Sequence, residues 1–223
     1  AHVHSSKSVR LVKGSHIVVP RLFEHDHAYI FQNPDGRIVF AIPYETDFTL
    51  IGTTDEDFKG ELSSVAASVE EIRYLCDAVI RYFRQPLSPD DVVWSYAGVR
   101  ALYDDHSSKP EDTTRDYHLD LDRHSGEAPL LTVYGGKITT YRRLAESALQ
   151  LLSPFFAMRG PWTAHDPLPG GDFAWDAIDD VAADMREQWP FLDAAFAKRL
   201  ARSYGTRAKD VLGAATSFED LGE

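Results

Sequence analysis

The stretch AYIFQNPDGRIVFAI, residues 28–42, decides the fold class. It contains two runs of β-branched and aromatic residues, at 28–32 and 37–42, on either side of the tetrapeptide NPDG at 33–36. Such runs are typical of strands, and Asn, Pro, Asp and Gly together are typical of a tight turn. We therefore predict an antiparallel hairpin. Both runs are apolar at consecutive positions, so we also expect other elements to cover both faces of the sheet.

The sequence on either side extends this pattern. Further strand-like runs lie at residues 16–20, 48–52, 92–100 and 117–121. Residues 68–84 instead place apolar side chains at spacings of three and four, which predicts a helix. Ser68 is the expected N-cap of this helix, and Glu71 is its capping-box partner.

The second half of the chain changes character twice. An apolar strand at 130–134 runs into Gly135, Gly136 and Lys137, and a helix is predicted over about residues 139–152. A linker rich in Pro and Gly then precedes three helical patterns, at about 175–188, 193–203 and 206–214. The organisation is an α+β fold: a β-rich block with one helix, a strand–turn–helix unit, and a helical tail.

Composition excludes several classes of function. The 223 residues carry a formal net charge of -12, which argues against a general nucleic-acid binder. The single cysteine, Cys76, rules out an intrachain disulfide, and the histidines show no spacing typical of a metal site. No apolar run is long enough to cross a bilayer. The GxGxxG fingerprint of a dinucleotide-binding fold is also missing from the sequence.

The strongest local signal for chemistry is LTVYGGKITTYR, residues 131–142. A helix start leaves unpaired backbone N–H groups and a partial positive charge, and two glycines allow a flat or anionic ligand to approach closely. Lys137 adds a full charge at the same point. The alternative is a plain strand-to-helix turn in which Lys137 is solvated, and the local pattern alone leaves both interpretations open.

Three further residues could serve a site. Arg100 ends one predicted strand and Arg115 begins the next, so that together with Lys137 they could bind a phosphomonoester. His16, at the start of a strand, could accept a proton near neutral pH. The alternatives are a hydrogen-bonded structural role for the histidine and ion pairs of the two arginines with acidic neighbours, namely Asp104, Asp105, Asp116 or Asp120.

Seven ordered blocks resemble a known family. They are residues 14–21 (GSHIVVPR), 51–55 (IGTTD), 95–100 (SYAGVR), 114–117 (TRDY), 135–142 (GGKITTYR), 168–171 (LPGG) and 201–205 (ARSYG). Their order and spacing resemble the aerobic, FAD-dependent glycerol-3-phosphate dehydrogenases from about Val9 to Glu223. Any one block is weak, but the ordered set is specific.

The resemblance implies three regions. Residues 1–127 would form a mainly antiparallel substrate-binding cap, residues 128–153 would complete the FAD domain with the strand, the GGK turn and a helix, and residues 154–223 would form a helical C-terminal domain. The N-terminal half that holds the FAD nucleotide in this family would lie outside the chain, which we expect to be truncated at both ends. The isolated fragment is therefore expected to be inactive and to retain no FAD.

The resemblance also implies residue roles. Arg100, Arg115 and Lys137 would contact the substrate, and His16 and Lys137 would be catalytic. Gly135, Gly136, Lys137 and Thr139 would lie beside the flavin. A base would take the proton of the substrate hydroxyl while hydride leaves to the flavin, and positive groups would hold the phosphate.

The activity that follows is oxidation of sn-glycerol 3-phosphate to dihydroxyacetone phosphate, with electrons passed through FAD to quinone. The expected location is cytoplasmic, on the inner face of the cytoplasmic membrane as a peripheral membrane protein, and a homodimer is compatible with the resemblance. A glycerol-3-phosphate oxidase, which gives electrons to oxygen, is the alternative enzyme. A non-enzymatic domain that keeps the cap scaffold is the alternative outside enzymes.

Overall fold

The computed structural model describes residues 7–123 and 127–222. The chain divides into two compact units, Ala1–Ala157 and Met158–Glu223. The first unit contains all the described strands together with two α-helices, and the second is helical. This confirms the predicted α+β class. The predicted boundaries after residues 127 and 153, which would separate the cap, the piece of the FAD domain and the C-terminal domain, stay predictions.

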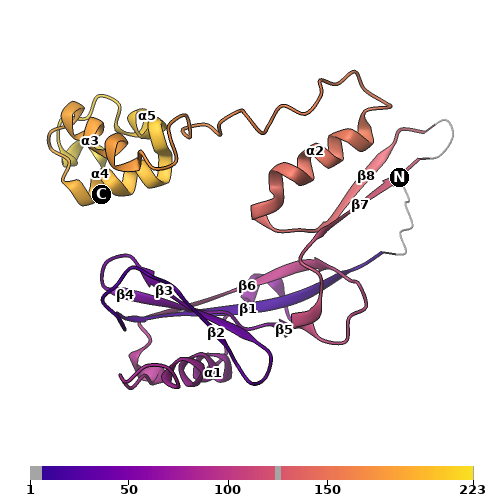
Figure 1. Cartoon of the computed structure of the whole chain (residues 1–223), viewed down its shortest axis with the longest axis horizontal. Helices are drawn as coiled ribbons and strands as arrows, with labels where there is room; N and C mark the ends of the chain where they lie inside the picture. Colours follow the sequence, from indigo (N-terminus) through magenta and orange to yellow (C-terminus); the bar gives the residue numbers. More distant parts are fainter. Residues whose placement is uncertain (1–6, 124–126, 223) are drawn as a thin grey trace. The chain divides into compact units, whose positions relative to one another are not determined.

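A six-stranded antiparallel sheet dominates the first unit (Figure 1). Its strands are β1 (Val9–Pro20), β2 (Tyr29–Gln32), β3 (Ile38–Tyr44), β4 (Phe48–Gly52), β5 (Glu56–Asp57) and β6 (Trp94–Tyr103). The order is β2-β3-β4-β1-β5, and β6 pairs with the other edge of β1. The predicted hairpin is confirmed, with Tyr29 opposite Ala41. The long strand β1 is central, because it pairs with β4, β5 and β6.

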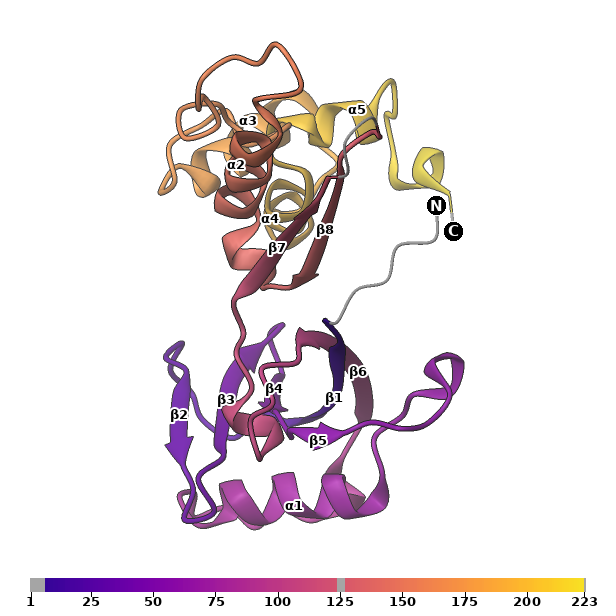
Figure 2. The same ribbon diagram turned by 90° about the vertical axis from the view of Figure 1, so that its right-hand side faces the viewer.

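The helix α1 (Val69–Ile80) covers one face of this sheet, as Figure 2 shows. The core between them is apolar and includes Ile17, Val19 and Ile51 from the sheet, with Leu75 and Val79 from the helix. The predicted capping box is confirmed as well. Ser68 accepts a hydrogen bond from the backbone N–H of Glu71, and Glu71 accepts one from that of Ser68.

The opposite face of β2 and β3 is open to solvent, so the prediction that both faces are covered is wrong for the described residues. Ile30 is 63% exposed, and Phe40 and Ile42 are also exposed. Successive strand residues point to opposite faces, so Phe31, Val39 and Ala41 enter the core while these three do not. The consecutive apolar pattern therefore correctly marks strands but says nothing of what covers them.

A second, two-stranded sheet follows in the same unit. The strands β7 (Tyr117–Asp122) and β8 (Leu130–Gly135) pair antiparallel, and a short 3₁₀ turn, η4 (Ile138–Thr140), leads into α2 (Tyr141–Leu152). The Tyr117 hydroxyl and Ser147 Oγ lie 3.1 Å apart, which joins the helix to the sheet. The remaining 3₁₀ turns of this unit are η1 (Leu62–Ser64), η2 (Pro89–Asp91) and η3 (Pro110–Asp112).

The second unit is a small helical domain. It comprises α3 (Ile178–Gln188), α4 (Ala194–Tyr204), η5 (Gly205–Arg207), α5 (Ala208–Leu212) and η6 (Phe218–Leu221). Gly170 and Gly205 both have positive φ and touch each other so closely that a Cβ on either would overlap the backbone of the other segment. The Thr206 N–H donates to the Gly170 carbonyl oxygen at 3.0 Å, which closes the contact. No helix within residues 7–123 and 127–222 is long and apolar enough to span a membrane.

Candidate functional site

The site begins where β1 and β6 run side by side. Gly14 lies opposite Gly98, and Val12 lies opposite Arg100. The Arg100 guanidinium extends over Gly14, where a Cβ would overlap both of its terminal nitrogens and lie 2.6 Å from Thr53 Oγ1. A glycine at position 14 is therefore what gives the arginine its place on the sheet.

Asp55 joins the two predicted arginines. Its Oδ1 accepts a hydrogen bond from Arg100 Nη1 at 3.1 Å and from Arg115 Nη2 at 2.9 Å. Arg100 Nη2 donates to Thr53 Oγ1 at 3.1 Å. Burial raises the pKa of Asp55 above its ordinary value, although both guanidinium charges oppose this effect. The two arginines thus converge on one largely buried carboxylate oxygen.

This partner differs from the acidic residues that the sequence suggested. Among the described residues, neither Arg100 nor Arg115 forms an ion pair with Asp104, Asp105, Asp116 or Asp120. The reason is topological. The segment after β4 lies beside β1 and β6, so Asp55 contacts Arg100 although the two residues are 45 positions apart in the sequence.

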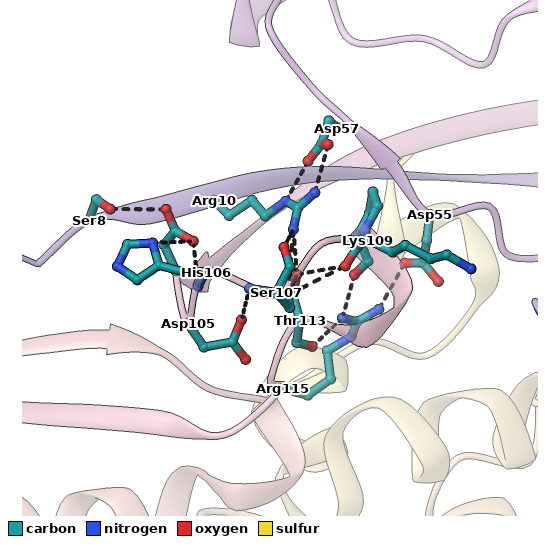
Figure 3. Close-up of polar contacts among 12 residues, drawn as sticks. Ser8, Arg10, Asp55, Asp57, Asp105, His106, Ser107, Lys109, Thr113 and Arg115 are labelled. Atoms are coloured by element: carbon teal, nitrogen blue, oxygen red, sulfur yellow. Dashed lines mark hydrogen bonds and ion pairs between the residues drawn. The ribbon is translucent and has the colours of Figure 1, made fainter.

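Arg115 is held by a braced loop (Figure 3). Its Nη1 donates to the carbonyl oxygens of Pro110 and Thr113, at 3.2 and 2.7 Å. Arg10 braces the same loop, since it donates to Thr113 Oγ1 and forms a two-pronged contact of 2.6 and 2.7 Å with Asp57. Several Arg115 donors are therefore already used by the protein, whereas within the described residues Arg100 makes two side-chain hydrogen bonds, with Asp55 and Thr53.

His16 lies on β1, two residues beyond Gly14. Its ring stacks on Tyr96 at 4.8 Å between centroids, with an interplanar angle of 3°. Gly52, directly opposite on β4, leaves room for the ring, because a Cβ there would overlap it. Nδ1 is buried, and no described residue forms a hydrogen bond with it. Burial and the charge of Arg100 lower the pKa of His16, so the imidazole is neutral at pH 7.

The GGK turn is the remaining part of the predicted site. Gly135 and Gly136 have φ values of 66° and 99°, which favour glycine. A Cβ on Gly135 would lie 3.2 Å from the Asp116 carbonyl oxygen, so the turn packs against the segment that carries Arg115. Lys137 and Thr139 are exposed. No hydrogen bond or ion pair joins either side chain to Arg100, Arg115 or His16 in the part of the chain that the structure describes.

These features fit one side of a flavin. The first N–H groups of a helical turn have no intrahelical acceptor, and Lys137 lies exposed next to them, which suits an electron-rich ring. The sequence contains no GxGxxG turn for the pyrophosphate. These residues would therefore contact the ring of a bound FAD rather than its pyrophosphate.

Sequence reasoning missed three contributors to this geometry. Asp55, Gly14 and Gly52 were visible only as members of the blocks at 51–55 and 14–21. Gly52 could have been found as a glycine directly opposite a large polar residue, His16, on the neighbouring strand, but that signal depends on knowing the register. No such signal marks Gly14, which lies opposite Gly98, or Asp55, which lies between β4 and β5.

The first 142 residues match the sequence profile of the family described as FAD dependent oxidoreductase. The chain belongs to this family. FAD, the cofactor implied by the resemblance, is the cofactor of the family, and the match covers all the described strands of the chain.

Individual relatives in this family confirm the resemblance. Over all 223 residues the chain is 49% identical to the aerobic glycerol-3-phosphate dehydrogenase of Escherichia coli, and it covers 44% of that protein. It is 47% identical over 219 residues to the D-erythritol 1-phosphate dehydrogenase of Brucella abortus, with 98% of the chain and 43% of the relative covered. The chain thus spans less than half the length of the curated relatives it matches.

A solved structure of an FAD-dependent oxidoreductase has the same fold. The glycerol-3-phosphate dehydrogenase of Bacillus halodurans, determined in complex with FAD, aligns with a TM-score of 0.72 at 29% identity. The alignment covers 93% of this chain and 40% of the other. The mixed α/β architecture of this chain is therefore that of part of a protein solved with FAD bound.

Proposed function

We propose that this chain is the substrate-binding part of an FAD-dependent enzyme that oxidises sn-glycerol 3-phosphate to dihydroxyacetone phosphate. The observation that carries the proposal is the convergence of Arg100 and Arg115 on Asp55 beside the neutral ring of His16. The relatives named as glycerol-3-phosphate dehydrogenases support it, since one is 49% identical over the whole chain.

Arg100 is the residue best suited to bind the phosphate. Its side chain is 31% exposed, and its planar group can offer two parallel donors to a phosphate dianion. Asp55 holds the guanidinium in one orientation before the substrate arrives. Arg115, largely committed to backbone carbonyls, contributes positive charge and keeps Asp55 in place.

His16 is our candidate for the base that accepts the hydroxyl proton. Because its pKa is lowered, the ring has a free lone pair at neutral pH, and the Arg100 charge draws the phosphate end of the substrate to the same region. FAD, when bound, supplies the acceptor for the hydride that leaves the substrate carbon. Lys137, on the exposed GGK turn, would stabilise the negative charge that develops there.

A second candidate substrate is D-erythritol 1-phosphate. The relative from Brucella abortus named for it is 47% identical to this chain, nearly as similar as the glycerol-3-phosphate dehydrogenase from Escherichia coli. The two compounds share a phosphomonoester on a polyol and differ by one carbon in length. The arginine site described here recognises the shared part, so a substrate comparison has to decide between them.

The electron acceptor and the location extend the same proposal. We propose quinone as the acceptor at the inner face of the cytoplasmic membrane, where the protein would be peripheral, and we regard a homodimer as its assembly. The relatives are named dehydrogenases, which favours quinone over oxygen. Reoxidation of the reduced flavin by a quinone analogue, compared with reoxidation by air alone, separates the dehydrogenase from an oxidase.

The experiment that tests the function uses the full-length flavoenzyme, meaning this chain joined to the FAD-binding half that the resemblance implies. Turnover is measured with glycerol 3-phosphate, D-erythritol 1-phosphate and glycerol. We expect Arg100→Ala to reduce transition-state binding of the phosphorylated substrate by about 2–4 kcal/mol, while the melting temperature changes little. Arg100→Lys should recover little, because an ammonium does not reproduce the planar fork.

The same measurements can contradict the proposed function or the role of Arg100. A wild-type protein that binds FAD but turns over neither phosphorylated polyol would favour the non-enzymatic alternative. A kcat/KM for Arg100→Ala within a few-fold of wild type would remove Arg100 from the phosphate site.

A further inference from the structure

A buried carboxylate lies directly behind the candidate site. Glu71 is the third residue of α1, and only 1% of it is exposed. Its Oε1 accepts hydrogen bonds from Ser15 Oγ and Thr54 Oγ1, each at 2.8 Å. Its Oε2 lies 2.7 Å from Lys13 Nζ and accepts the Ser68 N–H at 2.8 Å.

This carboxylate does more than cap a helix. A capping box requires only the contacts between Glu71 and Ser68. Glu71 uses its other oxygen to join two segments that are far apart in sequence, and the Ser15 N–H also donates to Thr54 Oγ1 at 2.9 Å. Burial disfavours its charge, but the contact with Lys13 and the other hydrogen bonds outweigh burial and hold the pKa below its ordinary value. The carboxylate is therefore ionised and fully engaged.

The two joined segments are those that carry the site. Ser15 stands between Gly14, which lies under Arg100, and His16. Thr54 stands between Thr53 and Asp55, the two residues to which Arg100 donates. Neighbouring residues of a strand point to opposite sides, so the contact of Ser15 with Glu71 fixes Gly14 and His16 on the other side of β1. In the second segment Thr54 bonds to Glu71, while Thr53 and Asp55 bond to Arg100.

The segment at Asp55 needs such support. Strand β4 ends at Gly52 and β5 begins at Glu56, and none of the strand pairings among the described residues includes positions 53–55. Asp55 is therefore not aligned by the sheet. Thr54, fully buried and bonded to both Ser15 and Glu71, is the tie that sets where its neighbour lies.

From this geometry we propose that Glu71, acting through Thr54 and Ser15, is a positioning residue for the phosphate site. It fixes Asp55, and Asp55 in turn orients Arg100 and Arg115. The inference rests on the proposed function, because the orientation matters only if the arginines bind a phosphorylated substrate. It assigns a role to α1 beyond its packing against the sheet.

The test compares two buried threonines in the full-length flavoenzyme. Thr54→Val keeps the shape of the side chain and removes the hydroxyl that joins Ser15 to Glu71. Thr49→Val is the matched control, because Thr49 is also fully buried and its Oγ1 accepts the Leu22 N–H, away from the site. Thr54→Ser restores the hydroxyl and serves as the rescue.

Three quantities are measured for each variant: KM for the phosphorylated polyol, the dissociation constant of inorganic phosphate, and the melting temperature without ligand. The phosphate dissociation constant is obtained from the dependence of the melting temperature on phosphate concentration. We expect Thr54→Val to raise KM and the phosphate dissociation constant together by about tenfold, with a smaller change in kcat. Thr54→Ser should stay near wild type, and Thr49→Val should lower only the melting temperature.

The outcomes separate this inference from the function on which it rests. If wild type neither turns over a phosphorylated polyol nor binds phosphate, the proposed function has failed. If wild type does both, but Thr54→Val and Thr49→Val have the same KM and phosphate affinity, the positioning role is overturned. Should Thr54→Val not fold, Ser15→Ala carries the test with the same readouts, since it removes one hydrogen bond to Glu71 and leaves Thr54 Oγ1 in place.

Discussion

Replacing Gly14 by alanine should impair the site while leaving the fold nearly intact. The new Cβ would overlap the terminal nitrogens of Arg100 and lie 2.6 Å from Thr53 Oγ1. Two of these three atoms are the end of the flexible Arg100 side chain, which can swing away at small cost to stability, whereas Thr53 Oγ1 must also shift. Gly14 is also outside the left-handed region of φ, so alanine strains no backbone there.

The size of the effect follows from the contacts that move. Arg100 would lose its alignment with Asp55 and Thr53, two hydrogen bonds in which a charged group takes part. We expect a loss of about 2–3 kcal/mol in transition-state binding, which is roughly 30- to 150-fold in kcat/KM. The assay is steady-state turnover of the full-length flavoenzyme with glycerol 3-phosphate, together with its melting temperature.

Gly98 provides the matched control. It lies opposite Gly14 on β6, and a Cβ there would meet nothing within 4 Å. Gly98→Ala should therefore keep full activity and gain about 0.4–1 kcal/mol of stability, because alanine restricts the unfolded chain. Equal kcat/KM values for Gly14→Ala and Gly98→Ala would refute the assignment of Arg100 to the site.

Three further outcomes are expected. In the wild-type flavoenzyme the acid limb of the kcat/KM profile should lie below pH 6.5, because the lowered pKa of His16 keeps its ring neutral down to lower pH. His16→Gln in the full-length flavoenzyme should remove this limb. An unchanged limb in rapid-mixing measurements of flavin reduction would exclude His16 as the base. The 223-residue chain alone should purify colourless, because it has no GxGxxG turn for the pyrophosphate, and a yellow product with stoichiometric FAD would contradict this. Gly205→Ala should lower the free energy of unfolding by about 2 kcal/mol or more in thermal melts, since its Cβ would overlap the Gly170 carbonyl oxygen. Gly213 also has a positive φ but has open space around it, so Gly213→Ala should lower the free energy of unfolding by less. Equal losses in the two variants would argue against the overlap.

Local features of this fold could be predicted from the sequence because their causes are local. The hairpin at 28–42 depends on a turn of four residues, and the cap of α1 depends on Ser68 and Glu71, three positions apart. The open face at Ile30 and Phe40 could not be predicted, because apolar periodicity reports which side chains avoid water and not what covers them.

In the site, too, some features could be predicted from the sequence and others could not. Arg100 and His16 were predicted and lie in one region, where burial and the charge of Arg100 lower the pKa of His16. Asp55, the partner of Arg100, was not predicted, because that contact spans 45 residues and needs the register of β1, β4 and β6. The roles of Lys137 and Thr139 beside a flavin stay predictions, since they depend on a bound cofactor.

The close contact between Gly170 and Gly205 bears on how genome sequences of this family are interpreted. The LPGG and SYG blocks are conspicuous in the sequence, yet what they meet in the structure is each other's backbone. They are requirements of packing, and a descendant that had lost its chemistry would still need them. A newly sequenced protein that keeps both glycine blocks but has replaced Asp55 or Arg100 should therefore be classified by ancestry alone. Assignment of enzymatic activity should rest on Asp55 and Arg100.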